Sequence, residues 1–140
     1  MVYKKKMLSA AYAMTSTLIS VVDDDASVRK TTKLLIESFG YRAAVFESAE
    51  TFLKSGRLND TSCLVVDVQM EGMTGLQLQS HLASEGYTIP IIFISAYGNK
   101  ESRRQAMQGG AIAFLDKPFR DEQLLKNIQS ALKQDGTKTN

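Results

Sequence analysis

The chain has 140 residues, of which 44% are hydrophobic and 23% are charged. This length suits one domain of common size, and the composition excludes a disordered chain, while no apolar run approaches the roughly 20 residues that span a membrane. The 17 basic and 15 acidic residues leave a net charge of +2, which is too balanced to predict nucleic-acid binding.

The first 16 residues are predicted to be an extension outside the domain. A basic start is followed over Met7–Met14 by small and apolar residues, and residues 11–13 read Ala-Tyr-Ala, which resembles a signal-peptide cleavage site. The apolar stretch is too short for a secretory signal, and polar residues interrupt it. We therefore expect a segment that is poorly fixed or ordered by docking on a neighbour; the alternative is a natural start at Met14.

The first predicted strand covers residues 18–22, and a helix follows it. Asp25 and Ser27 are both suited to cap this helix, because a short polar side chain accepts hydrogen bonds from the first free N–H groups. The helix is expected to run to about Phe39, and Gly40 fits its C-terminal stop. Its inward-facing residues are predicted to be Val28, Leu35 and Phe39.

The second strand is predicted over residues 42–46, and a short helix follows over 48–53. The third strand covers 63–66, which is a run of apolar residues that includes the one cysteine. Thr74 or Gly75 opens the next helix. The inward residues of that helix are predicted to be Leu78 and Leu82.

The fourth strand is predicted over residues 90–94, and the polar helix after it covers 100–108 and ends at a pair of glycines. The fifth strand covers 112–115, and the last helix is expected over 121–133. Residues 135–140 are predicted to be a tail or the start of a linker. The inward residues of the last helix are predicted to be Leu124, Leu125, Ile128 and Leu132.

The alternation of five strands and five helices predicts an α/β fold. The strands are almost continuously apolar, which indicates burial on both faces. A parallel sheet between two layers of helices is the architecture that buries strands in this way.

Polar residues follow four of the five predicted strands. In an open parallel sheet, ligands bind beyond the carboxyl ends of the strands, so these side chains are expected to converge at one edge. They are Asp23, Asp24 and Asp25 after the first strand, Asp67 after the third, Ser95 after the fourth and Lys117 after the fifth.

A group of carboxylates at one edge predicts a divalent cation. Carboxylates a few Å apart repel each other in a partly buried cleft, and Mg²⁺ prefers such oxygen ligands. The sequence offers no set of zinc ligands, because Cys63 and His81 are the single cysteine and the single histidine. Cys63 is predicted to be a buried thiol in a reducing compartment, and His81 is predicted to face solvent or to be partly packed.

With Mg²⁺ beside it, Asp67 has a chemical use. A carboxylate can attack phosphorus and form an acyl phosphate, and Lys117 can offset charge on the phosphoryl oxygens. Ser95 can donate a hydrogen bond to the phosphoryl group once it is present. Taken singly, each residue has an ordinary explanation as a helix cap, a turn residue or a loop residue; their joint placement favours phosphoryl chemistry.

At this point the sequence resembles the CheY-like receiver domain of two-component response regulators, over residues 17–134. The matching motifs are Val21–Asp25, Val65–Met70, Ile94–Ala96 and Leu115–Phe119. Asp67 lies 28 residues before Ser95 and 50 before Lys117. These spacings resemble the FixJ-like branch, whose members often carry a LuxR-type DNA-binding domain.

The resemblance implies a flavodoxin-like, doubly wound fold with five parallel strands in the order 2-1-3-4-5. It implies a role for each matching position, and Lys117-Pro118 aligns with a peptide bond that is commonly cis in the family. Asp67 aligns with the phosphorylated aspartate, Asp24 with the direct Mg²⁺ ligand, Asp23 with its often water-mediated partner, Gln69 with the backbone carbonyl ligand, Ser95 with the switch hydroxyl and Phe114 with the switch aromatic residue.

The resemblance also implies partners. A sensor histidine kinase would supply the phosphoryl group, and the family commonly dimerises through the surface formed by the 100–108 helix, the 112–115 strand and the 121–133 helix. The domain itself is expected to bind neither nucleic acid nor membrane and to act in the cytoplasm. The chain is either a stand-alone receiver or part of a longer transcription factor, and the FixJ-like spacing favours the second.

One motif departs from the family pattern. The usual Met-Pro-Gly after the aspartate is replaced by Met70-Glu71-Gly72. Loss of the proline loosens the loop, and Glu71 adds a negative charge, so we expect altered loop flexibility or partner choice rather than loss of phosphorylation. Gln69 and Tyr97 occupy positions that tune the lifetime of the acyl phosphate in the family.

Three rival functions remain open at the level of sequence. A haloacid-dehalogenase-like phosphatase needs a second aspartate two residues after the nucleophile, where this chain has Gln69. A receiver-like module that is never phosphorylated would not need Asp24, Asp67, Ser95 and Lys117 together. A nucleotide-binding protein would need a glycine-rich loop after the first strand, and none is present.

Overall fold

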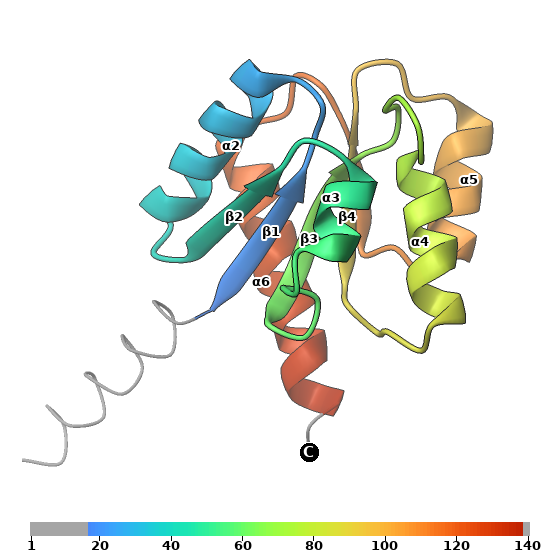
Figure 1. Cartoon of the computed structure of the whole chain (residues 1–140). Coiled ribbons are helices and arrows are strands. Elements are labelled where there is room, and N and C mark those ends of the chain that lie inside the picture. The colour runs from blue at the N-terminus through green and yellow to red at the C-terminus, as the bar shows by residue number, and fades with distance from the viewer. Residues whose placement is uncertain (1–16, 139–140) are drawn as a thin grey trace, which may run out of the picture.

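The computed structural model describes residues 17–138, with side chains as far as Lys133. The predicted N-terminal extension lies outside these residues. Five parallel strands form one sheet in the order β2-β1-β3-β4-β5, which confirms the predicted fold (Figure 1). The strands are β1 (Leu18–Val22), β2 (Arg42–Phe46), β3 (Thr61–Asp67), β4 (Ile91–Ser95) and β5 (Ala113–Asp116).

Five helices alternate with these strands and cover both faces of the sheet. They are α2 (Ala26–Ser38), α3 (Ala49–Lys54), α4 (Gly75–Ser84), α5 (Lys100–Gln108) and α6 (Asp121–Lys138). Figure 1 shows α2 and α6 on one side of the sheet and α3, α4 and α5 on the other. None of the described helices is both long and apolar enough to span a bilayer.

Short polar side chains begin the helices at the predicted places. Asp25, rather than Ser27, caps α2, since its carboxylate accepts hydrogen bonds from the backbone N–H groups of Ser27 and Val28. Ser48 caps α3. Thr74 caps α4, where Gln77 completes a capping box. These caps fix where the chain turns from the strand edge into each helix.

Two hydrophobic clusters lie on opposite faces of the sheet. Alternate β3 residues point to opposite faces, so Val65 packs under α2 and α6, while Val66 packs under α3, α4 and α5. Cys63 is fully buried on the α2 and α6 side, as predicted for a structural thiol. The strands are therefore enclosed on both faces, which explains their continuous apolar sequences.

The inward stripe of α2 is centred differently from the prediction. Thr32 and Ile36 are the buried residues of this helix. Val28, Leu35 and Phe39 are partly buried and flank that centre, against the same cluster. The apolar spacing predicted the correct face of the helix but not the centre of that face, because a buried threonine does not appear in an apolar pattern.

Several element boundaries also differ from the prediction: β4 covers Ile91–Ser95 rather than 90–94, and β5 covers Ala113–Asp116 rather than 112–115. β3 begins at Thr61 rather than Cys63. The side chain of Thr61 is buried, and its hydroxyl forms a 2.7 Å hydrogen bond with the Ser20 hydroxyl of β1. This bond makes a polar residue acceptable inside the sheet. The helix α6 continues to Lys138, past the predicted end at residue 133, so it includes the first part of the segment predicted as a tail or the start of a linker.

Candidate functional site

Asp67 is the last residue of β3, the central strand of the sheet. The neighbouring strands β1 and β4 end at the same edge of the sheet, because Val22 pairs with Val66 and Ile94 pairs with Asp67. The residue is 8% exposed. A carboxylate in this position is surrounded by the loops that follow three adjacent strands.

Two further carboxylates lie beside Asp67. Asp23, Asp24 and Asp67 each offer a carboxylate oxygen, and these oxygens lie within 4.8 Å of one another. Asp23 is fully buried and Asp24 is exposed. Asp25, the third acid of the run, instead caps α2. The predicted convergence is therefore confirmed for two of the three acids after β1.

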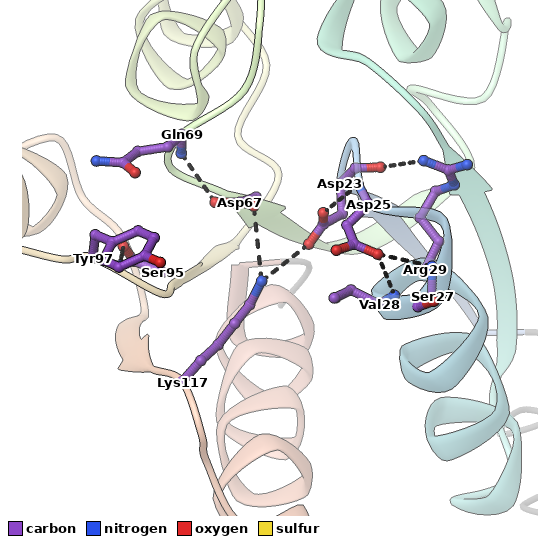
Figure 2. Close-up of polar contacts among 10 residues, drawn as sticks. All are labelled: Asp23, Asp25, Ser27, Val28, Arg29, Asp67, Gln69, Ser95, Tyr97 and Lys117. Carbon is purple, nitrogen blue, oxygen red and sulfur yellow. Dashed lines mark hydrogen bonds and ion pairs between the residues drawn. The ribbon is translucent and has the colours of Figure 1, made fainter.

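Lys117 brings one positive charge to this acidic group. Its Nζ lies 3.5 Å from Asp23 Oδ2 and 3.8 Å from Asp67 Oδ2, between the two carboxylates (Figure 2). Its backbone N–H donates a 2.8 Å hydrogen bond to the carbonyl of Ser95, which joins the ends of β5 and β4. The Lys117-Pro118 peptide bond is cis.

The electrostatics of the site act mainly on Asp67. Burial raises the pKa of this carboxyl above its ordinary value, and the neighbouring Asp23 and Asp24 add to the rise, while the Gln69 N–H and Lys117 oppose it. The ionised form of Asp67 is therefore held in an unfavourable environment. A cation or a covalent phosphoryl group would change that balance.

The remaining predicted positions surround Asp67 without all touching it. The backbone N–H of Gln69 donates to Asp67 Oδ1 at 3.0 Å, and its side chain is exposed. Ser95 is 1% exposed, and its hydroxyl oxygen accepts a 3.2 Å hydrogen bond from the Tyr97 N–H. Phe114 lies on β5 with its side chain buried. Their roles stay predictions.

Two residues that the sequence did not single out support this edge. Arg29 of α2 donates a 2.7 Å hydrogen bond to the Asp23 carbonyl. Arg29 follows Asp23 by only six residues, so a local sequence pattern could have found this contact. Glu50 of α3 accepts a 3.2 Å hydrogen bond from the Met73 N–H and lies against Gly72, in the loop that follows Asp67. Glu50 is 23 residues away in sequence, and no local pattern predicts this contact.

Gly75, the first residue of α4, lies directly against the backbone of Asp67, where only a residue without a side chain fits. A Cβ at this position would lie 2.5 Å from the Asp67 carbonyl oxygen and 3.1 Å from the Val68 Cα. Because both neighbours are backbone atoms, Gly75→Ala is expected to push the end of β3 outward and to destabilise the fold by about 1–3 kcal/mol. Thermal unfolding and phosphoryl incorporation measured together would check this.

The control for that variant is Gly86→Ala. Gly86 has a φ of +84°, and a Cβ there would meet nothing within 4 Å. This change strains the backbone but leaves Asp67 in place, so stability should fall while phosphoryl incorporation is retained. Equal incorporation in the two variants would contradict the proposed displacement of Asp67 by Gly75→Ala.

Comparison with known proteins gives the family. A family model described as response regulator receiver domain matches residues 19–129. Nodulation protein W of Bradyrhizobium diazoefficiens is 42% identical over 88% of this chain and 54% of its own length. The transcriptional regulatory protein TdiR of Thauera aromatica is 42% identical over 84% of this chain and 52% of its own length. The chain thus spans about half the length of these curated relatives.

Solved structures agree with the sequence relatives. The response regulator StyR is 39% identical with a TM-score of 0.82, over 89% of this chain and 63% of StyR. The structure named FixJ-N is 31% identical with a TM-score of 0.77, over 86% of this chain and 96% of its own. Together with the acidic group at the β3 edge, these matches show that the chain belongs to the response regulator receiver domain family, whose members are two-component signalling modules rather than classical enzymes.

Proposed function

We propose that Asp67 accepts a phosphoryl group from the phosphohistidine of a sensor kinase. Membership of the receiver family implies a cognate histidine kinase. The observation that carries the proposal is the placement of a buried Asp67 carboxylate between two acids and one lysine. In the transfer, an Asp67 oxygen bonds to phosphorus, the P–N bond breaks, and the histidine nitrogen keeps the electron pair.

The acidic group fits Mg²⁺. The three carboxylate oxygens within 4.8 Å form a hard, all-oxygen donor set, and among the described residues no histidine or cysteine joins this group to favour zinc. Asp24, Asp23, Asp67 and the Gln69 backbone carbonyl are the proposed ligands. The bound ion would supply positive charge to the phosphoryl oxygens. The raised pKa of Asp67, with its first cause in burial, agrees with a site that a cation stabilises.

The other edge residues have proposed roles in the same step. Lys117, which already contacts Asp67, would hold one phosphoryl oxygen as the acyl phosphate forms. Ser95 would move away from the Tyr97 N–H, and its hydroxyl would donate a hydrogen bond to another phosphoryl oxygen. Movement of Ser95, with Phe114 in the space that it vacates, would then repack the surface formed by α5, β5 and α6. The domain would dimerise through this surface.

An apolar hollow beside the site suits the kinase. Its volume is about 380 Å³, and Val28, Leu35 and Phe119 line it together with Lys117 at the edge of the acidic group. A helix of the kinase that carries the phosphohistidine would bury apolar surface there and bring the phosphoryl group to Asp67.

We also propose the boundaries of the domain and the kind of protein in which it acts. We assign the receiver to residues 17–134. Because relatives named as transcriptional regulators are about twice as long as the matched region, we propose that the receiver controls a LuxR-type DNA-binding domain, with a stand-alone receiver as the alternative. The domain would not itself bind DNA, and it would act in the cytoplasm, where a kinase can reach it.

Intact-mass measurement tests the proposed function. The protein is incubated with Mg²⁺ and phosphoramidate, and in parallel with a phosphorylated histidine kinase, and is then weighed. One added phosphoryl group that does not form when a chelator is present from the start supports a Mg²⁺-dependent phosphoacceptor. Rapid turnover of several phosphomonoesters would instead indicate a phosphatase, and an unchanged mass with every donor would indicate a binding module that is never phosphorylated.

Magnesium is expected to stabilise the fold through the acidic group. An ion that binds the folded chain and not the unfolded chain raises stability by RT ln(1 + [Mg²⁺]/Kd). At about one hundred times Kd, this is about 2.7 kcal/mol. Asp24→Asn should remove most of this gain, while Glu85→Gln, an exposed change at the end of α4, should keep it. Equal Mg²⁺-dependent shifts of Tm in the two variants would exclude Asp24 as a ligand.

A further inference from the structure

Arg103 of α5 makes three separate contacts with β5. One guanidinium nitrogen forms an ion pair with Asp116 Oδ2 at 2.7 Å. The other donates a 3.1 Å hydrogen bond to the Phe114 carbonyl. The guanidinium carbon lies 4.8 Å from the centre of the Phe114 ring. A single side chain therefore holds both the backbone and the ring of Phe114.

The Phe114 ring is enclosed by its surroundings. Phe114 is 5% exposed, and its ring centre lies 6.3 Å from that of Phe93 on the neighbouring strand. The backbone of the loop after β4 closes another side, because a Cβ on Gly98 would lie 2.7 Å from Phe114 Cε1. The described structure therefore has Phe114 turned inward, with Arg103 over its ring.

The helix α5 depends on few contacts with the sheet. Ala106 is its one buried residue, and the Ala106 carbonyl accepts a 2.9 Å hydrogen bond from the Gln79 side chain of α4. The ion pair from Arg103 to Asp116 is about half exposed, so alone it contributes little. Its value is geometric, since it orients the guanidinium over the ring, where a cation–π contact contributes further.

We propose that Arg103 is a positioning residue that holds Phe114 in its buried arrangement in the unphosphorylated protein. On this proposal, the ring of Phe114 is buried before Ser95 moves. The Ser95 hydroxyl still accepts from the Tyr97 N–H, while the aromatic ring is already buried. Phosphorylation would need to move Ser95 and the loop after β4, with the ring placed in advance.

The effect of Arg103 on signalling rests on the proposed function. If the phosphorylated state requires a buried Phe114 ring, contacts that stabilise the buried position also favour binding of a phosphoryl group. The reason is that the equilibrium between outward and buried ring is linked to the binding equilibrium. Removal of Arg103 would then lower the fraction of molecules that are ready to bind. The position of the ring in the free protein does not depend on this link.

The test compares Arg103→Met and Arg103→Lys with a matched control, Arg104→Met. Arg104 is the next residue of α5, is similarly exposed, and bonds to Glu101 and Gln108 of the same helix. Each protein is labelled with ¹³C-phenylalanine, and the Phe114 ring signals are assigned with Phe114→Leu. Spectra are recorded in the free protein and during titration with beryllofluoride, a phosphoryl analogue, in the presence of Mg²⁺.

In the free protein, Arg103→Met should raise the ratio of outward to buried rings about two- to fivefold. Arg103→Lys should give a smaller change, and Arg104→Met should match the wild type. The beryllofluoride Kd should rise in the same order. Identical free-protein ring signals in Arg103→Met and Arg104→Met would overturn the proposal. Failure of the wild type to take up any phosphoryl group or analogue would refute the proposed function and leave the ring comparison valid.

Discussion

Replacement of Asp67 by asparagine is expected to abolish phosphoryl incorporation completely. The amide keeps the size of the side chain and its hydrogen bond from the Gln69 N–H, but it cannot act as the nucleophile. Intact-mass measurement after incubation with Mg²⁺ and either donor should show no added phosphoryl group. Asp60→Asn is the control, because it removes an exposed carboxylate just before the opposite end of β3. Full incorporation in Asp67→Asn would assign the acceptor to another residue.

The same variant should be more stable than the wild type without metal. Burial raises the pKa of Asp67 in the folded protein, so its ionised form opposes folding at every pH above the ordinary carboxyl range. Asparagine carries no charge and removes this penalty. At pH 7 with a chelator, Tm should rise by about 2–5 °C. The gain should shrink or reverse in Mg²⁺, because the ion then has one carboxylate fewer to bind.

Replacement of Lys117 by methionine is expected to give three effects of different sign. Phosphoryl incorporation should slow at least about a hundredfold, since one preorganised positive group is lost from the developing phosphoryl charge. The metal-free fold should lose about 1–3 kcal/mol, because the fully buried Asp23 loses its ammonium partner at 3.5 Å. Mg²⁺ should bind severalfold more tightly, because a competing cation has left the acidic group.

This combination separates a site effect from general damage. Misfolding would weaken Mg²⁺ binding together with the other two properties. Lys126→Met removes the same charge from an exposed position of α6 and should change none of the three. Magnesium affinity can be followed from the shift of Tm with ion concentration. Weaker Mg²⁺ binding in a folded Lys117→Met protein would show that Lys117 does not compete with the ion.

The sheet was predictable because its signals are local. Each strand is a short apolar run closed by a polar residue or a turn, and α2, α3 and α4 begin at side chains, such as Ser48 and Thr74, that cap them. Thr61 and Thr32 were missed for a shared reason. Each is a polar residue buried by the tertiary structure, and a pattern of apolar residues cannot identify such a position.

The candidate site was predictable because parallel strands end at one edge. Asp67 and Lys117 are 50 residues apart, yet the strand order brings their side chains within 3.8 Å. The sequence offered Asp25 both as a candidate cap and as one of three acids at this edge, because a cap and a metal ligand use the same side chain; in the structure it is the cap. The sequence also did not predict the Arg103 contacts, which depend on how α5 packs against β5.

The buried position of Cys63 has a practical consequence for spectroscopy. It is the one cysteine of the sequence, and its side chain is fully inaccessible inside the sheet. A thiol reagent should therefore leave the native protein unmodified while it stays folded. A cysteine introduced at exposed Met107 of α5 would be the sole reactive thiol, so a single fluorescent or spin probe could report movement of this helix without further mutation.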